Sequence, residues 1–176
     1  MGKRSSFERV ERDFYPTPPE AVVPLIPHLL QGGVYFEPCA GNYDLIEHLN
    51  MAGQNCCGAS DIDGSHHESC LSLDVFDLNM EHVAHDIDYF ITNPPWDRKI
   101  LHPLIVHLSR MAPTWLLFDA DWMHTKQSAD LIKYCSKIVS VGRVKWIPDS
   151  KMTGKDNCAW YLFGKEISDK TIFIGR

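Results

Sequence analysis

The sequence predicts an α/β protein built on a mainly parallel sheet, with helices on both faces. Short apolar segments of strand length recur along the chain, amphipathic segments of helix length separate them, and no repeat or low-complexity tract interrupts the series. The 176 residues, 44% of them hydrophobic, fit one domain with one core. We expect a charged, mobile segment over residues 1–12 and a single domain over 13–176, without a separate domain for target recognition.

Seven strands are predicted, and the last two suggest an antiparallel edge after the parallel series. The predicted strands cover residues 34–37, 55–60, 71–78, 88–92, 114–118, 137–147 and 159–164. Thr17 has the position of a helix cap, because Pro18 follows it and Glu20 lies three residues on. Further helices are predicted over 44–52, 99–111 and 127–135, whereas 64–70 is too short for a full crossover helix.

Composition excludes several classes of protein. No apolar run approaches the roughly 18 residues that a membrane helix needs, and the N-terminus is too polar for a secretory signal. The six cysteines follow no disulfide framework, so we expect reduced thiols in a cytoplasmic protein without a membrane partner. Cys57, His66, His67 and Cys70 lack the tight paired spacing of zinc ligands, and we expect no metal.

The net charge of −6 is unevenly distributed. Residues 1–97 hold 4 Lys/Arg and 16 Asp/Glu, whereas residues 98–176 hold 13 Lys/Arg and 7 Asp/Glu. A basic C-terminal half suits a polyanion such as nucleic acid, and an acidic N-terminal half suits a small cationic ligand. Solvated charged faces explain the same pattern equally well.

The most specific signal is the segment Asn93-Pro94-Pro95-Trp96, which ends the predicted strand over 88–92. Two prolines stiffen the backbone and remove two N–H donors, so the Asn93 side-chain oxygen and the Pro94 carbonyl remain as acceptors. Such a pair can hold both hydrogens of an –NH2 group and direct its nitrogen towards an electrophile. Trp96 offers a flat face for stacking a planar base or amide.

Two earlier strand ends carry further candidate residues. The first strand ends in Glu37 and leads into a turn at Gly41, where a glycine lets the backbone approach a ligand closely. The second strand ends at Asp61, about 20 residues after that turn, where a carboxylate can accept the hydroxyls of a ribose. In open α/β sheets, ligands bind beyond the carboxyl ends of the strands, so we expect these segments to meet.

Together these segments resemble the amino-methyltransferase branch of the class I S-adenosylmethionine-dependent methyltransferases, especially the adenine-specific (N6) DNA enzymes. The resemblance spans residues 15–163 and implies a Rossmann-like fold, S-adenosylmethionine as cofactor and direct methyl transfer without a metal. It implies catalytic roles for Asn93, Pro94, Pro95 and Trp96. It implies donor-binding roles for Tyr15, Thr17, Pro18, Glu37, Ala40, Gly41, Asp61, Ile62, Asp74 and Val75. Trp146, by a looser match, is similar to an aromatic residue that stacks on the target base.

One departure from this family is Tyr43, which stands where the glycine loop usually has a second glycine. A bulky residue there is expected to crowd the donor or to reshape the loop. Two further residues are expected at the substrate, namely Trp122, after the fifth predicted strand, and Lys151, in the polar loop over 148–157.

The resulting hypothesis is a DNA adenine methyltransferase, with target recognition by that polar loop or by a partner protein. Methylation of RNA adenine or of a protein glutamine amide is a second hypothesis, because the same motif serves these acceptors. A third is a binding protein with a methyltransferase fold and an impaired donor loop.

Overall fold

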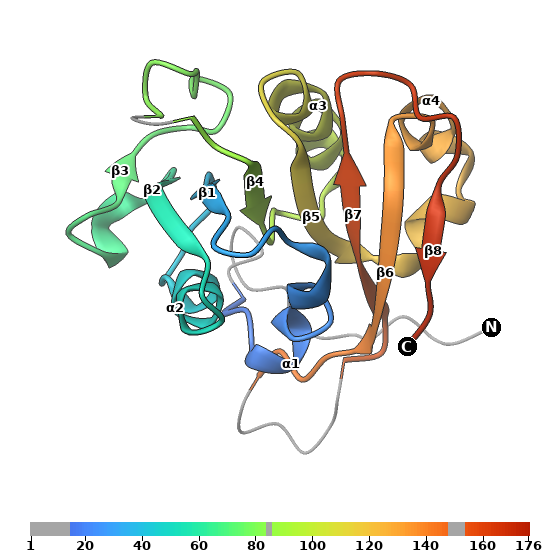
Figure 1. Ribbon diagram of the computed structural model, residues 1–176, viewed down its shortest axis with the longest axis horizontal. Helices are drawn as coiled ribbons and strands as arrows, with labels where there is room; N and C mark the ends of the chain where they lie inside the picture. The colour runs from blue at the N-terminus through green and yellow to red at the C-terminus, as the bar shows by residue number, and fades with distance from the viewer. Residues whose placement is uncertain (1–14, 84–85, 148–153) are drawn as a thin grey trace.

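The computed structural model describes residues 15–83, 86–147 and 154–176, which form one eight-stranded sheet with short helices around it (Figure 1). The strands are β1 (Val34–Glu37), β2 (Asn55–Asp61), β3 (Leu71–Ser72), β4 (Tyr89–Thr92), β5 (Thr114–Asp119), β6 (Cys135–Arg143), β7 (Asn157–Phe163) and β8 (Ile172–Ile174). The α-helices are α1 (Pro19–Val22), α2 (Asp44–Met51), α3 (Arg98–Ser109) and α4 (Ala129–Ile132). Four 3-10 helices complete the set: η2 (Ile26–His28), η3 (Gly64–His66), η4 (Ala120–His124) and η5 (Lys126–Ser128).

The strand order is β3-β2-β1-β4-β5-β7-β6-β8. Pairing is parallel from β3 to β5, β7 is antiparallel to both of its neighbours, and β8 pairs in parallel with β6. The predicted α/β class is therefore confirmed, with two differences in detail. The sheet has an eighth strand, and the antiparallel strand lies inside the sheet rather than at its edge.

The burial of β7 explains why this strand lies inside the sheet and not at its edge. Residues 158–161 of this strand are buried in succession, so the backbone and both faces of the strand require neighbours. The additional strand β8 has only three residues, two of them exposed, and this leaves no clear hydrophobic pattern in the sequence.

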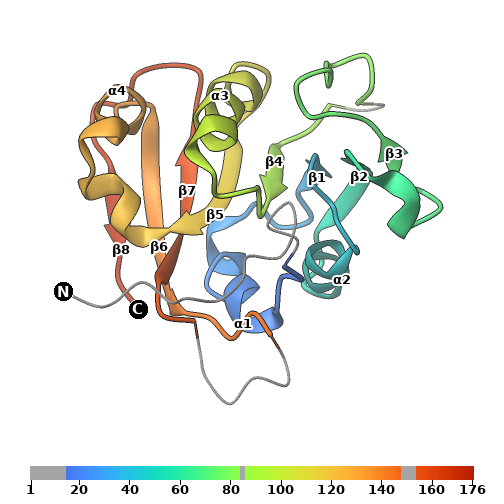
Figure 2. The same ribbon diagram turned by 180° about the vertical axis from the view of Figure 1, so that it is seen from behind.

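Two hydrophobic layers cover the two faces of the sheet. Strand residues alternate between them, as Phe36 and Phe90 show by packing in the α3 layer while Tyr35 and Ile91 pack in the layer of α1 and α2. Figures 1 and 2, which view the molecule from opposite sides, show α1 and α2 on one face and α3 and α4 on the other. The central strands β1, β4 and β5 are thus buried on both faces.

Local interactions limit two of the predicted helices. The first ends after four residues and a 3-10 turn follows, because Pro24 and Pro27 interrupt it, as the two prolines in this segment lead us to expect. The segment 127–135 divides into η5 and α4 because the Ser128 hydroxyl donates to the carbonyls of Met123 and Thr125, while Cys135 already pairs with Phe163 in the sheet.

The third predicted strand, expected as a short strand within 71–78, is Leu71–Ser72. Beyond it, the Asp74 carboxylate accepts the Phe76 amide, and the Asp77 amide donates to the Asp74 carbonyl. These bonds turn the chain, so the strand does not continue.

None of the helices in the described part of the chain combines the length and the apolar character that crossing a membrane requires.

The close packing of β1 on β2 leads to a first prediction. Gly58 lies opposite Phe36, and an added Cβ would come within 2.9 Å of the Phe36 ring, which is 1% exposed and has no room to move. We expect Gly58→Ala to lower the free energy of unfolding by about 1–3 kcal/mol through this overpacking. Gly164→Ala, whose Cβ would meet no atom within 4 Å, is the control and should change stability by less than about 0.5 kcal/mol in urea unfolding. Equal stabilities of the two variants would contradict this account.

Candidate functional site

The candidate site lies where three strands end. β1 pairs with β2 on one side and with β4 on the other, so the order of the strands reverses between β1 and β4. The carboxyl ends of these strands carry Glu37, Asp61 and, directly after β4, Asn93. Ligands of open α/β sheets bind at such a reversal, and the described segments around it hold most of the residues predicted for the site.

The Asn93 side chain is held in one orientation by two hydrogen bonds. Its Nδ2 donates to the Thr17 Oγ1 at 3.1 Å, and its Oδ1 accepts the Trp96 indole N–H at 3.3 Å. Thr17 is 5% exposed, so this contact is shielded from water. Thr17 does not cap α1, as its sequence position predicted, because its hydroxyl accepts from Asn93 and Pro18 occupies the cap position.

Aromatic side chains surround this corner. The rings of Trp96 and Trp146 meet edge to face, with centroids 5.8 Å apart, and the ring of Tyr15 lies 6.4 Å from that of Trp146. All three are partly buried. The structure thus brings together Asn93 with three aromatic residues that the sequence distributes over 132 positions.

The turn after β1 is bound directly to the end of β2. The Gly41 amide donates to the Asp61 Oδ2 at 2.9 Å, and the Asp63 amide donates to the Asp61 Oδ1 at 2.9 Å. Gly41 adopts a positive φ of 51°, which a glycine tolerates without strain. Ala40 is buried beside it, and its amide donates to the Ser60 carbonyl at 3.0 Å. Three of the predicted donor-binding residues therefore form one bonded unit.

A buried carboxyl group, that of Glu37, lies at the end of β1, next to this turn. Glu37 is 1% exposed, and its Oε2 lacks a hydrogen-bond partner among the described residues. Burial, and then the negative charge of Asp61, raise the pKa of Glu37 well above its ordinary value, while the nearby Thr92 hydroxyl opposes the shift. Burial also raises the pKa of the Cys39 thiol, with smaller contributions from Asp61, Glu37 and Asp74.

Tyr43 adopts a left-handed conformation, with φ 72°, at the N-cap of α2. This conformation is natural for glycine but costs a bulky residue on the order of 1 kcal/mol. The Tyr43 ring stacks on the His67 ring, with centroids 3.8 Å apart and planes 15° apart. Tyr43 therefore keeps the backbone form expected of a glycine, and His67 engages its ring.

Three predicted site residues have other surroundings, and a fourth is not described. Trp122 is 1% exposed and its indole donates to His102 Nε2 at 2.9 Å, so it belongs to the core and not to an open acceptor site. Val75 is 8% exposed and packs in the core layer of α3, whereas the Ile62 side chain is 58% exposed beyond the end of β2. Lys151 lies outside the described residues.

Sequence reasoning missed three residues of the site. His67 contacts Tyr43, the thiol of Cys70 lies near the Tyr43 hydroxyl, and Thr92 lies beside Glu37 and Cys39. Only Thr92 carried a signal, because it directly precedes Asn93. The other two depend on the fold of the segment after β2.

Two shallow surface grooves of about 500 Å³ lie elsewhere. One lies over α3 and α4, lined by residues such as His102 and Arg110, and the other lies beside β8, lined by Ile138 and Phe173. Neither contains the hydrogen-bonded polar groups that the strand ends bring together, so we place the site at the strand ends.

Comparison with known proteins rests on solved structures. No family model matches the chain, and no curated protein matches it. A candidate RNA methyltransferase from Pyrococcus horikoshii has 17% identity and a TM-score of 0.59, with 94% of this chain and 95% of that chain covered.

Two further solved structures are similar. A dimethyladenosine transferase from Plasmodium falciparum has 13% identity and a TM-score of 0.55, with 85% of this chain and 62% of that chain covered. The methyltransferase subunit of a type I restriction-modification system from Streptococcus thermophilus has 10% identity and a TM-score of 0.59, with 92% and 47% covered. The fold is that of the Rossmann-like methyltransferases. The chain spans less than two thirds of the length of these last two proteins, and the likeness concerns the methyltransferase fold alone.

A second prediction follows from the buried Glu37. In the unfolded chain this carboxyl ionises around its ordinary pKa of 4.5, whereas the folded protein keeps it protonated to higher pH. The unfolded state then binds fewer protons, so the contribution of Glu37 to stability falls as pH rises above 4.5 towards the raised pKa. We expect Glu37→Gln to gain in melting temperature over the natural protein between pH 4.5 and 8. A difference that stays constant over this range would show that Glu37 titrates normally.

Proposed function

We propose that this chain is an S-adenosylmethionine-dependent N-methyltransferase that methylates the exocyclic amino group of adenine in a nucleic acid, with DNA as the first acceptor to test. The observation that carries the proposal is the Asn93 amide, which Thr17 orients at the end of β4 next to the strand-order reversal. A fixed amide at this position supports recognition of an –NH2 group beside a bound donor.

The residues at the ends of β1 and β2 fit a cationic donor. The negative charges of Asp61, Glu37 and Asp74 all contribute to the raised pKa of the Cys39 thiol, and the Glu37 Oε2 lacks a partner among the described residues. The donor would lie over the turn at Gly41, with its ribose hydroxyls on Asp61. When bound, S-adenosylmethionine supplies a sulfonium methyl group that passes to the amino nitrogen, while the carbon–sulfur electron pair stays on sulfur and an amino proton is released to water.

The residues after β4 would position the acceptor. The Asn93 Oδ1 accepts one bond from Trp96 and, as a carbonyl oxygen, has a second lone pair for a substrate hydrogen. The Pro94 carbonyl would take the other hydrogen, and this pairing would draw the nitrogen lone pair towards the methyl group. Positioning and electrostatics supply the catalysis. Trp96 and Trp146 would contact the flat faces of the base.

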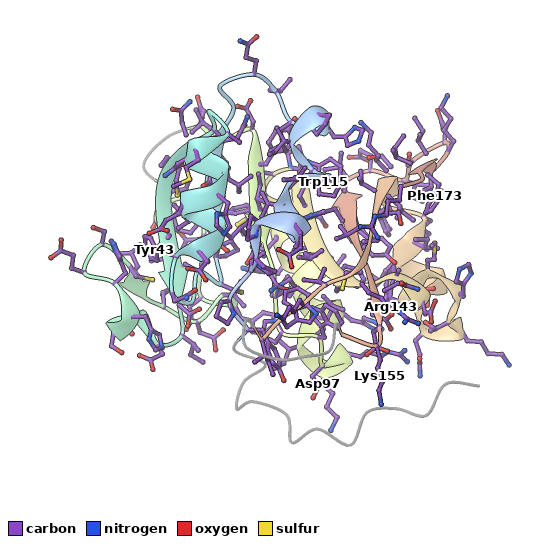
Figure 3. The ribbon with its side chains drawn as sticks, turned by 90° about the horizontal axis from the view of Figure 1, so that it is seen from below. Tyr43, Asp97, Trp115, Arg143, Lys155 and Phe173 are labelled. Carbon is purple, nitrogen blue, oxygen red and sulfur yellow. The ribbon has the colours of Figure 1, made fainter. Side chains whose placement is uncertain are left out.

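Two observations support a nucleic acid as acceptor. The similar solved structures include proteins named for RNA and for dimethyladenosine. Arg143 and Lys155 lie at the same end of the molecule as Asp97, which caps α3 just after the Asn93 motif (Figure 3). The resemblance of residues 15–18 to the adenine-specific DNA enzymes favours DNA as that nucleic acid. An adenine in a duplex would have to be flipped out of the stack, and a partner protein would be a second means of recognising the target.

The acceptor is identified by incubating the protein with labelled donor and separate pools of DNA, RNA and protein. Mass spectrometry of the digested pools should detect N6-methyladenine in DNA. Label in RNA adenine or in glutamine would redirect the proposal to that acceptor. The absence of label in all three pools, together with no donor binding by calorimetry, would favour the binding-protein hypothesis.

A third prediction concerns Asn93 itself. We expect Asn93→Ala to lower turnover by about 100-fold or more, because the variant loses the acceptor that holds the substrate amino group. Donor affinity measured by calorimetry should change little, since Asn93 is not among the residues that we propose bind the donor. Full turnover in this variant would refute the mechanism.

A fourth prediction tests the orientation of Asn93 by Thr17. Thr17→Val keeps the volume of the side chain but removes the acceptor for the Asn93 amide hydrogen. We expect turnover to fall about tenfold, because the amide is no longer held in its productive orientation. Thr17→Ser retains a hydroxyl and serves as the matched control, with turnover close to that of the natural protein. Equal losses in both variants would show that Thr17 acts by packing rather than by its hydrogen bond.

A further inference from the structure

The backbone of Tyr43 is strained, because its φ is positive. Among the described residues other than glycine, Tyr43 is the one with a positive φ. Bulky side chains rarely adopt this conformation, and such residues gather at ligand sites, where the surrounding structure holds them. Tyr43 closes the turn after β1, because its amide donates to the Ala40 carbonyl at 2.9 Å. The strain therefore lies in the turn that we propose binds the donor.

The structure after β2 presents a partner to the Tyr43 ring. His67 stacks on it at 3.8 Å, and the Ser69 amide donates to the His67 Nδ1 at 3.2 Å, which fixes the rotation of the imidazole. The Cys70 amide donates to the His67 carbonyl at 3.0 Å and closes a turn over 67–70. Burial raises the pKa of the Tyr43 hydroxyl, and the Cys70 thiol contributes to the same shift. His67 is thus oriented by local bonds before it contacts Tyr43.

The segment after β2 has little core packing of its own. Residues 65–69 are all exposed, and the short η3 is held mainly by the Asp63 carboxylate, which accepts the Ser65 amide and hydroxyl. Segments with few buried contacts open at low free-energy cost. A contact with a neighbouring turn therefore has a large effect on how well this segment is ordered.

We infer that the stacked pair Tyr43–His67 is a positioning device for the donor site. It clamps the turn after β1 to the segment after β2, and so maintains the spacing between Gly41 and the Asp61 carboxylate that the donor requires. The Gly41–Asp61 hydrogen bond is the inner link between these two segments, and the stack is the outer link. This inference rests on the proposed function, because it assigns Tyr43 and His67 to the affinity for S-adenosylmethionine.

The test is a double-mutant cycle on the dissociation constant of S-adenosylmethionine, measured by calorimetry with the full chain. Tyr43→Gly relieves the backbone strain but removes the ring, and His67→Ala removes the other half of the stack. Each should weaken donor binding about three- to tenfold, and the double variant should be no weaker than the single variants, because all three lack the same contact. Tyr43→Phe keeps the stack and should bind within about twofold of the natural protein. His124→Ala, an exposed histidine on η4, is the control and should leave binding unchanged.

Thermal unfolding of the same variants separates positioning from a merely structural role. We expect Tyr43→Gly to lose donor affinity without a matching loss of melting temperature, because glycine is unstrained at this φ. Unchanged affinity in both single variants, additive effects in the double variant, or a lowered melting temperature with normal affinity would each overturn the inference. A natural protein that binds no donor would refute the proposed function and the inference together. Normal binding by the natural protein and by all variants would refute the inference alone.

Discussion

The parallel pairing of β1 with β2 on one side and with β4 on the other is the constraint on which the site depends. Each of these strands is followed by a polar segment, and parallel strands direct those segments to the same edge of the sheet. The pairing is enforced by burial, since Tyr35 and Phe36 of β1 are each at most 1% exposed and pack in opposite core layers. A one-residue slip of β1 would exchange these two faces and move Glu37 away from Asp61.

Different physical interactions organise the two halves of the site. On the acceptor half, the Asn93 amide donates to the Thr17 hydroxyl and accepts from the Trp96 indole, so neutral hydrogen bonds preorganise it without any charge. On the donor half, carboxyl groups gather, and burial together with the negative charge of Asp61 opposes ionisation of Glu37. A cationic ligand would favour the ionised form of Glu37, which links the electrostatics of the site to the chemistry that we propose for it.

The tightest agreement between sequence and structure concerns short segments with strong local signals. The strand over 34–37 has the predicted bounds, and the predicted helices at 44 and 99 begin within one residue of α2 and α3, because their apolar faces are periodic. The helix predicted over 127–135 is shorter than expected, because Ser128 donates to preceding carbonyls and Cys135 pairs in the sheet. Trp122 comes after the fifth strand, as predicted. Its large apolar ring packs in the core against Phe118 and Tyr161, because burial there stabilises the fold more than exposure in an open cleft would.

By itself, the sequence determined the α/β class, the rigid Asn93-Pro94 corner and the positions of Glu37 and Asp61 at strand ends, because these depend on local periodicity and on proline stereochemistry. Only the tertiary structure decided that Thr17 orients Asn93 across 76 residues and that His67 stacks on Tyr43. Such contacts depend on how distant segments are brought together by the sheet, and no spacing along one chain encodes the distance between two side chains in space.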